Sequence, residues 1–102
     1  MIDLIQFVGL NDLQESSQHI VKNLSEKYIF KIRNNIRKAT SIKVHIKQKK
    51  KSDHLSFYTA LIQVIVPHKV HEIEKEDRDL TILVRKSFQA LTNEVNHYTQ
   101  SR

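Results

Sequence analysis

Apolar side chains recur with two different periods along this chain, and each period favours one kind of backbone. Between Leu13 and Ile32 they return every three or four residues, which places them on one side of an α-helix. The members of this stripe are Leu13, Ser17, Val21, Leu24, Tyr28 and Ile32. Between Ile42 and Ile46 every second residue is apolar and the others are Lys or His, which is typical of a strand with one buried and one basic face. The two periods together predict a fold that combines helices with a sheet.

The first helix has recognisable boundaries. We expect Asp12 to cap its start, with Glu15 three residues later, and the two asparagines at 34–35 to favour a turn at its end. A short strand should precede it within residues 2–8, because Gly9 supplies turn chemistry directly afterwards.

The second half of the chain predicts two more strands and a second helix. Residues 49–53 form a polar hairpin loop, and residues 55–66 form a central strand that is apolar, and therefore buried, on much of both sides, until Pro67 ends it. Residues 68–77 could form a fourth strand or begin a helix, and we favour the strand because a hairpin turn fits around Pro67. Asp79 then caps a helix. Its apolar face is expected to consist of Leu80, Leu83, Val84, Ser87, Phe88, Leu91, Val95 and Tyr98.

The expected order of elements is therefore β-α-β-β-β-α. Each helix has a single apolar stripe, so both should pack on one face of a four-stranded sheet, which gives a two-layer α+β sandwich. One domain spanning residues 1–102 is expected, since the length allows one core and a single Gly and a single Pro leave no flexible linker.

Positive charge is concentrated in one part of the chain. Eleven of the 17 Lys and Arg residues lie between Lys22 and Lys51, where Glu26 is the only acid, so this window carries +10. The other 72 residues carry −4, which gives the net charge of +6. Such a cluster opposes folding by its own repulsion, and a polyanionic partner would offset that cost. The pattern indicates a nucleic-acid binder.

The candidate RNA-binding residues are cations of both helices and of the segment between them. Lys27 and Lys31 lie one turn apart on one side of the first helical stripe, and Lys22 lies on the other side. A groove or ridge between the helices could present the helical cations to phosphates. Such contacts depend on charge and on the length of the side chain, and they do not distinguish one base from another. The complete set is Lys22, Lys27, Lys31, Arg33, Arg37, Lys38, Lys43, Lys47, Arg85 and Lys86.

Signals for catalysis and metal binding are weak. Without cysteine the chain cannot form a disulfide, a zinc–thiolate site or a cysteine nucleophile, and His68 and His71 do not have the spacing of a helical zinc pair. Glu72, Glu74 and Glu76 would share one face of a strand and could gather a cation, although a solvated edge strand is the simpler explanation. We expect no enzyme activity, no metal and no cofactor. We also expect a cytoplasmic protein without a membrane partner or a small-molecule substrate.

Three short patterns are shared with a known family. They are Ile5-x-Phe7-x-Gly9-x-Asn11, the Ile42/Val44/Ile46 strand after a basic helix, and Asp79-Leu80 followed by Val84, Phe88, Leu91 and Val95. With them the chain resembles the short ribosome hibernation-promoting factors, also described as ribosome-associated inhibitors. The resemblance covers nearly the whole chain, including the order of its elements.

This resemblance implies a β-α-β-β-β-α protein that binds ribosomal RNA of the small ribosomal subunit, in the channel used by messenger and transfer RNA. It implies that translation is silenced in stationary or stressed cells. Matched by position, it assigns the RNA contacts of the helices to Lys22, Lys27, Lys31, Arg33, Arg85 and Lys86. Two alternatives stay open: a general double-stranded-RNA module, whose α-β-β-β-α order is related, and a protein-interaction domain that uses a basic face. The oligomeric state is not predicted.

Overall fold

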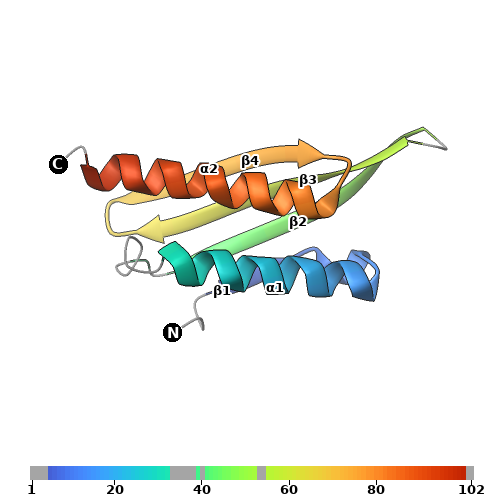
Figure 1. Ribbon diagram of the computed structural model, residues 1–102, viewed down its shortest axis with the longest axis horizontal. Coiled ribbons are helices and arrows are strands. Elements are labelled where there is room, and N and C mark those ends of the chain that lie inside the picture. The colour runs from blue at the N-terminus through green and yellow to red at the C-terminus, as the bar shows by residue number, and fades with distance from the viewer. Residues whose placement is uncertain (1–4, 33–38, 40, 53–54, 101–102) are drawn as a thin grey trace.

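A four-stranded sheet with two helices on one of its faces makes up this computed structural model, which describes residues 5–32, 39, 41–52 and 55–100 (Figure 1). The elements are β1 (Ile5–Val8), the 3₁₀ turn η1 (Leu10–Asp12), α1 (Glu15–Ile32), β2 (Ser41–Ser52), β3 (Leu55–Val66), β4 (Lys69–Asp77) and α2 (Leu80–Gln100). The predicted α+β sandwich and the predicted order are confirmed. In the part of the chain described, neither helix has a stretch long and apolar enough to cross a membrane.

The strands lie in the order β1-β2-β3-β4. β1 pairs with β2 in parallel, whereas β2 with β3 and β3 with β4 are antiparallel. A parallel pair requires a crossover, which α1 supplies between the first two strands. The two helices lie side by side and run in the same direction, from right to left in Figure 1.

Strand register decides which side chains face the helices. Val44 of β2 pairs with Ile62 of β3, and both are buried beneath the helix layer. The residues between such buried positions point to the other side of the sheet, because side chains alternate along a strand. No described element covers that side, which we call the open face.

α2 packs as the sequence predicts. The Asp79 carboxylate accepts a hydrogen bond from the backbone N–H of Ile82 at 3.0 Å, which confirms the predicted cap. Of the eight residues expected on its apolar face, all but Tyr98, whose side chain lies outside the description, are buried. Phe88 is fully buried and stacks on Tyr28 of α1, with ring centroids 5.7 Å apart. This aromatic pair joins the two helices.

α1 differs from the prediction at its start and in its buried side. Asp12 belongs to the 3₁₀ turn and the helix begins at Glu15, so Asp12 does not cap it. The buried residues within α1 are Val21, Ser25, Ile29 and Ile32. Leu24 and Tyr28 are only half-buried, and Tyr28 packs against α2. The end expected at 34–35 lies outside the described residues.

The strand predictions have mixed outcomes. Residues 69–77 form a strand, as favoured, after a turn in which His68 has a left-handed φ of 72°. The loop expected at 49–53 is wrong over most of its length, since β2 continues to Ser52. β3 is central in the sheet as predicted, but it is not buried on both sides: Ile65 is 38% exposed, because both helices cover the same face.

Gly9 ends β1 in a conformation that favours glycine. Its φ is 85°, and a Cβ at this position would clash with the backbone carbonyl oxygen of Ile46 on β2. The close approach lets the chain turn into the 3₁₀ segment directly against the neighbouring strand, in agreement with the turn chemistry predicted there.

Candidate nucleic-acid interface

The ten predicted RNA-binding residues are divided between two faces of the molecule. Arg33, Arg37 and Lys38 lie outside the described residues. Lys43 and Lys47 alternate with buried residues of β2 and therefore point to the open face. The other five lie on the helix layer, on the opposite side of the molecule: Lys22, Lys27, Lys31, Arg85 and Lys86.

On α1, Lys27 and Lys31 are exposed on the side that faces α2. The Lys31 ammonium lies 5.6 Å from the centroid of the Tyr28 ring, which itself stacks on α2. A cation above an aromatic face is stabilised by about 0.5–1 kcal/mol at an exposed site, so Tyr28 helps to position this charge. Lys22 is also exposed, but it precedes Lys27 by five residues, which is about 140° around a helix. It therefore lies on the other side of α1.

On α2, the two adjacent cations have different surroundings. The Lys86 ammonium lies 2.9 Å from a carboxylate oxygen of Asp77, at the end of β4. The pKa of Asp77 is lowered, first by the hydrogen bond that the Asp79 backbone N–H donates and then by the hydrogen bond from Lys86. Arg85 is exposed and has no carboxylate partner within the described residues. The charge of Lys86 is therefore compensated within the chain, whereas that of Arg85 is not.

A shallow hollow of about 600 Å³ lies between the two helices. It is lined by Tyr28, Lys31, Ile32, Gln89, Thr92, Asn93 and Asn96. Arg85, one turn before Gln89, and Lys27, one turn before Lys31, stand at its margin. We call this hollow with its two marginal cations the interhelical groove. Its ammonium and guanidinium groups suit phosphates, and its side-chain amides can hydrogen-bond sugars and bases.

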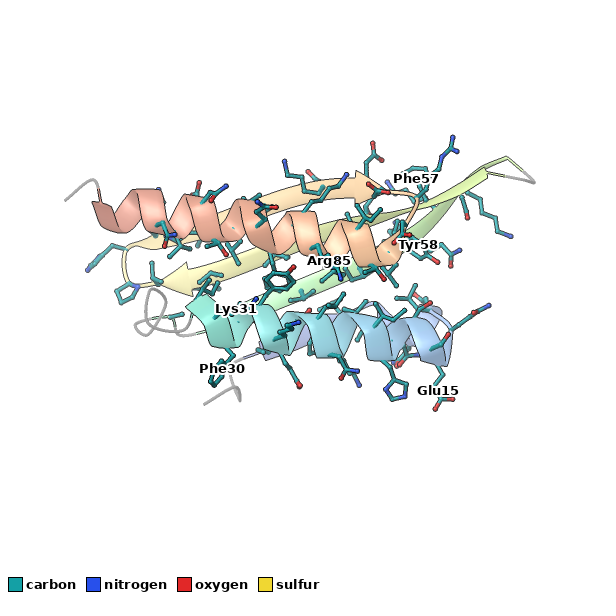
Figure 2. The ribbon with its side chains drawn as sticks, in the orientation of Figure 1. Glu15, Phe30, Lys31, Phe57, Tyr58 and Arg85 are labelled. Atoms are coloured by element: carbon teal, nitrogen blue, oxygen red, sulfur yellow. The ribbon has the colours of Figure 1, made fainter. Side chains whose placement is uncertain are left out.

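The labelled side chains show the direction of the groove (Figure 2). Lys31 and Arg85 lie toward the space between the two helix ribbons, whereas Phe30 extends from α1 away from α2. Phe30 is 56% exposed and is therefore not part of the groove. The groove cations thus come from two helices that are far apart in the sequence and are held together by the Tyr28–Phe88 stack.

Sequence reasoning identified Lys31 and Arg85 but missed the uncharged polar residues of the groove, which are Gln89, Thr92, Asn93 and Asn96. Arg85, Gln89, Thr92 and Asn96 follow the spacing i, i+4, i+7 and i+11, which places them in one row along α2. The spacing of this row can be read from the sequence. Only the fold shows that the row faces α1 and therefore forms one wall of the groove. Tyr28 was assigned to the core, and it also supports Lys31.

Two exposed lysines of the β2–β3 hairpin were assigned to a loop and not to the site. Lys49 and Lys50 pair with Phe57 and Ser56 of β3, whereas β4 reaches only as far as Tyr58. The hairpin therefore projects beyond the rest of the sheet as two strands, at the upper right of Figure 1. These lysines extend the positive surface beyond the helix layer.

Metal binding has no support in the part of the chain described, where no three His, Asp or Glu side chains come together to hold an ion. His71 is buried, 1% exposed, and its Nδ1 is hydrogen-bonded to a carboxylate oxygen of Glu94 at 2.9 Å. This pair links β4 to α2. The residue that looked like half of a metal pair in the sequence is thus a core histidine with a carboxylate partner.

Comparison with known sequences finds neither a matching protein family nor a matching curated protein. Solved structures do match. A ribosomal subunit interface protein from Coxiella burnetii superposes with a TM-score of 0.72 at 18% identity, over 94% of this chain and 97% of that one. The N-terminal domain of protein Y from Thermus thermophilus gives 0.63 at 18% identity, over 96% and 99%. The resemblance to ribosome hibernation factors is therefore confirmed at the level of the fold, which this chain shares with both proteins over almost its whole length.

Proposed function

We propose that this chain is a ribosome-associated factor of the hibernation type, which binds small-subunit ribosomal RNA through the interhelical groove and blocks translation sterically under stress or in stationary phase. Its fold is that of a protein described as a ribosomal subunit interface protein, with almost complete coverage of both chains. The observation that carries the proposal is the grouping of Lys27, Lys31 and Arg85 around one groove, none of them paired with a carboxylate of the described chain.

The groove is suited to binding and not to a chemical reaction. Lys31 is held above Tyr28, which is stacked on the fully buried Phe88, so one phosphate-binding group is positioned before RNA arrives. The amides of Gln89 and Asn93 lie beside it. A domain held this way acts by occupying space, and needs no catalytic residue, metal or cofactor.

The direct test is a sedimentation assay with purified small subunits at graded salt, with free duplex RNA as competitor. The three groove cations alone should give a slope of log affinity against log salt of about −2 to −3. We expect small subunits to bind far more tightly than duplex RNA. Equal affinity for the two would instead identify a general double-stranded-RNA module, and binding that ignores salt would exclude the electrostatic contact.

A second arm separates RNA binding from protein binding. A pull-down from lysate is repeated after nuclease treatment, and ribosomal components should be lost. Partners that survive the nuclease would favour a protein-interaction domain that uses its basic face. Polysome gradients from growing and starved cells then test the inhibitory role, because the protein should move into the small-subunit or monosome fractions on starvation.

A further inference from the structure

The open face of the sheet carries a charge pattern that the proposed RNA contact does not use. Its side chains form three columns, one on each of the three longest strands. β2 contributes Lys43, His45, Lys47 and Lys49. β3 contributes Phe57, Thr59, Leu61, Gln63 and Ile65. β4 contributes Val70, Glu72, Glu74 and Glu76. A basic column is thus separated from an acidic column by a neutral and partly apolar one.

The strand register aligns these columns into rows. The three rows, each running from β2 through β3 to β4, are Lys43–Gln63–Glu72, His45–Leu61–Glu74 and Lys47–Thr59–Glu76. The outer columns are two strands apart, or about 10 Å, which is too far for a direct ion pair. Within the described residues no ion pair joins the two columns; the nearest polar link is the bond that Gln63 donates to Glu72 at 2.5 Å.

This face has an apolar pair and a hollow that can accept a partner. Ile65 pairs with Val70 near the β3–β4 turn, and the two are 38% and 51% exposed. Farther along the face, a hollow of about 200 Å³ is lined by His45, Lys47, Lys49, Thr59, Ala60, Leu61 and Glu74. The glutamate column would repel a polyanion, so the open face suits a protein surface that carries both signs of charge.

We propose that the open face is a self-association surface, and that its occupant is the open face of a second copy of this chain. A two-fold axis parallel to β3 places β3 over β3 and β2 of each copy over β4 of the other. Lys43 then faces the partner's Glu72, and Lys47 faces the partner's Glu76. A two-fold axis perpendicular to the strands would instead place lysines over lysines, so the charge pattern selects the first arrangement.

The available area fits a weak dimer. Three strands of each copy overlap in this arrangement, because β1 lies beyond the partner's β4. Nine positions of β3 are paired with β4, which gives a length of about 31 Å, and three strands are about 14 Å wide. The overlap therefore covers about 450 Å² per copy, or about 900 Å² in total, in the range of weak and transient interfaces. The helix layer stays exposed on the outside of such a dimer. The interhelical groove is not covered, and the inference does not depend on the proposed function.

A charge-swap experiment tests the arrangement. One variant, Lys43→Glu/Lys47→Glu, makes both outer columns acidic, and the other, Glu72→Lys/Glu76→Lys, makes both basic. Each is expected to weaken its own dimer by at least about tenfold, because like charges then face each other in every such pair. Mixing the two variants should restore a heterodimer. Both variants keep a positive net charge, so long-range attraction between whole molecules cannot cause the recovery.

The measurement is sedimentation equilibrium of the full chain over a concentration series at low and high salt, with circular dichroism as the check on folding. The wild type should dimerise, and more weakly at high salt. A wild type that stays monomeric up to about 1 mM at low salt overturns the proposal, as does a mixture that stays monomeric. If a double variant does not fold, the single variants Lys47→Glu and Glu76→Lys, which alter one row, give the same test.

Discussion

Neutralising the two α1 lysines of the interhelical groove should change how RNA binding depends on salt. Lys27→Gln/Lys31→Gln removes two of the three groove cations and keeps side chains of similar length. Each lost phosphate contact reduces the slope of log affinity against log salt by about 0.7–0.9, so the double variant should lose about 1.4–1.8. Affinity for small subunits should fall about 25- to 60-fold at 0.1 M salt and only about five- to ninefold at 0.3 M. The loss is smaller at higher salt because the free energy of counterion release from each phosphate contact decreases with the logarithm of the salt concentration.

The matched control removes two cations from the other side of α2. Lys75 and Arg78 are exposed on and just after β4, and Lys75→Gln/Arg78→Gln lowers the net charge by the same amount. Neither residue lines the interhelical groove, so the slope should stay almost unchanged. Affinities come from sedimentation with small subunits at four or more salt concentrations. Equal slopes for both double variants would mean that net charge, and not the groove, determines binding, and the reasoning would fail.

Two further predictions concern the fold. Ser25 is fully buried in α1, and its hydroxyl has no hydrogen-bond partner within the described residues. Ser25→Ala should therefore raise the free energy of unfolding by about 1 kcal/mol more than the exposed control Asn23→Ala does, and the melting temperature by about 5 °C more. A smaller increase in the free energy of unfolding than in the control would contradict this. Because the pKa of Asp77 is lowered in the folded state, its ionised form stabilises the protein above its unfolded pKa near 4 and that contribution is lost as pH falls through the lowered value. Asp77→Asn should therefore unfold at lower urea than the wild type at pH 7, with a difference that shrinks toward acid pH, and a difference that is constant with pH would exclude the carboxylate as its cause.

The sequence was informative where one period dominated a segment. The apolar stripe of α2 was predicted because this helix buries one continuous side, from Leu80 to Val95. α1 was harder, because it packs against both the sheet and α2. Ser25 and Ile29 face the sheet and are buried, whereas Tyr28 turns toward α2 and is half-buried. A helix that packs against two neighbours has a wider apolar arc, and residue type alone does not show which residues of that arc are the most buried.

The candidate site was predicted in its residues but not in its geometry. Lys31 and Lys47 belong to one basic window of the sequence, yet they lie on opposite faces of the molecule, because strand alternation turns β2's lysines away from the helices. The hydrogen bond between the buried His71 and the partly exposed Glu94 had no local signal, since the two residues are 23 positions apart. Pairings of this kind appear only when the fold brings β4 against α2.

The shared direction of the two helices has an electrical consequence. The peptide dipoles of each helix leave about half a positive charge at its first turn and half a negative charge at its last, and in parallel neighbours these partial charges add instead of cancelling. Both first turns lie at the end of the molecule from which the hairpin with Lys49 and Lys50 projects (Figure 1). The backbone and these ammonium groups therefore polarise the 48 Å long axis in the same sense. The carboxylates of Glu15, in the first turn of α1, and of Asp79, at the cap of α2, lie at the same end and oppose this polarisation, so each helix start carries its own compensating charge.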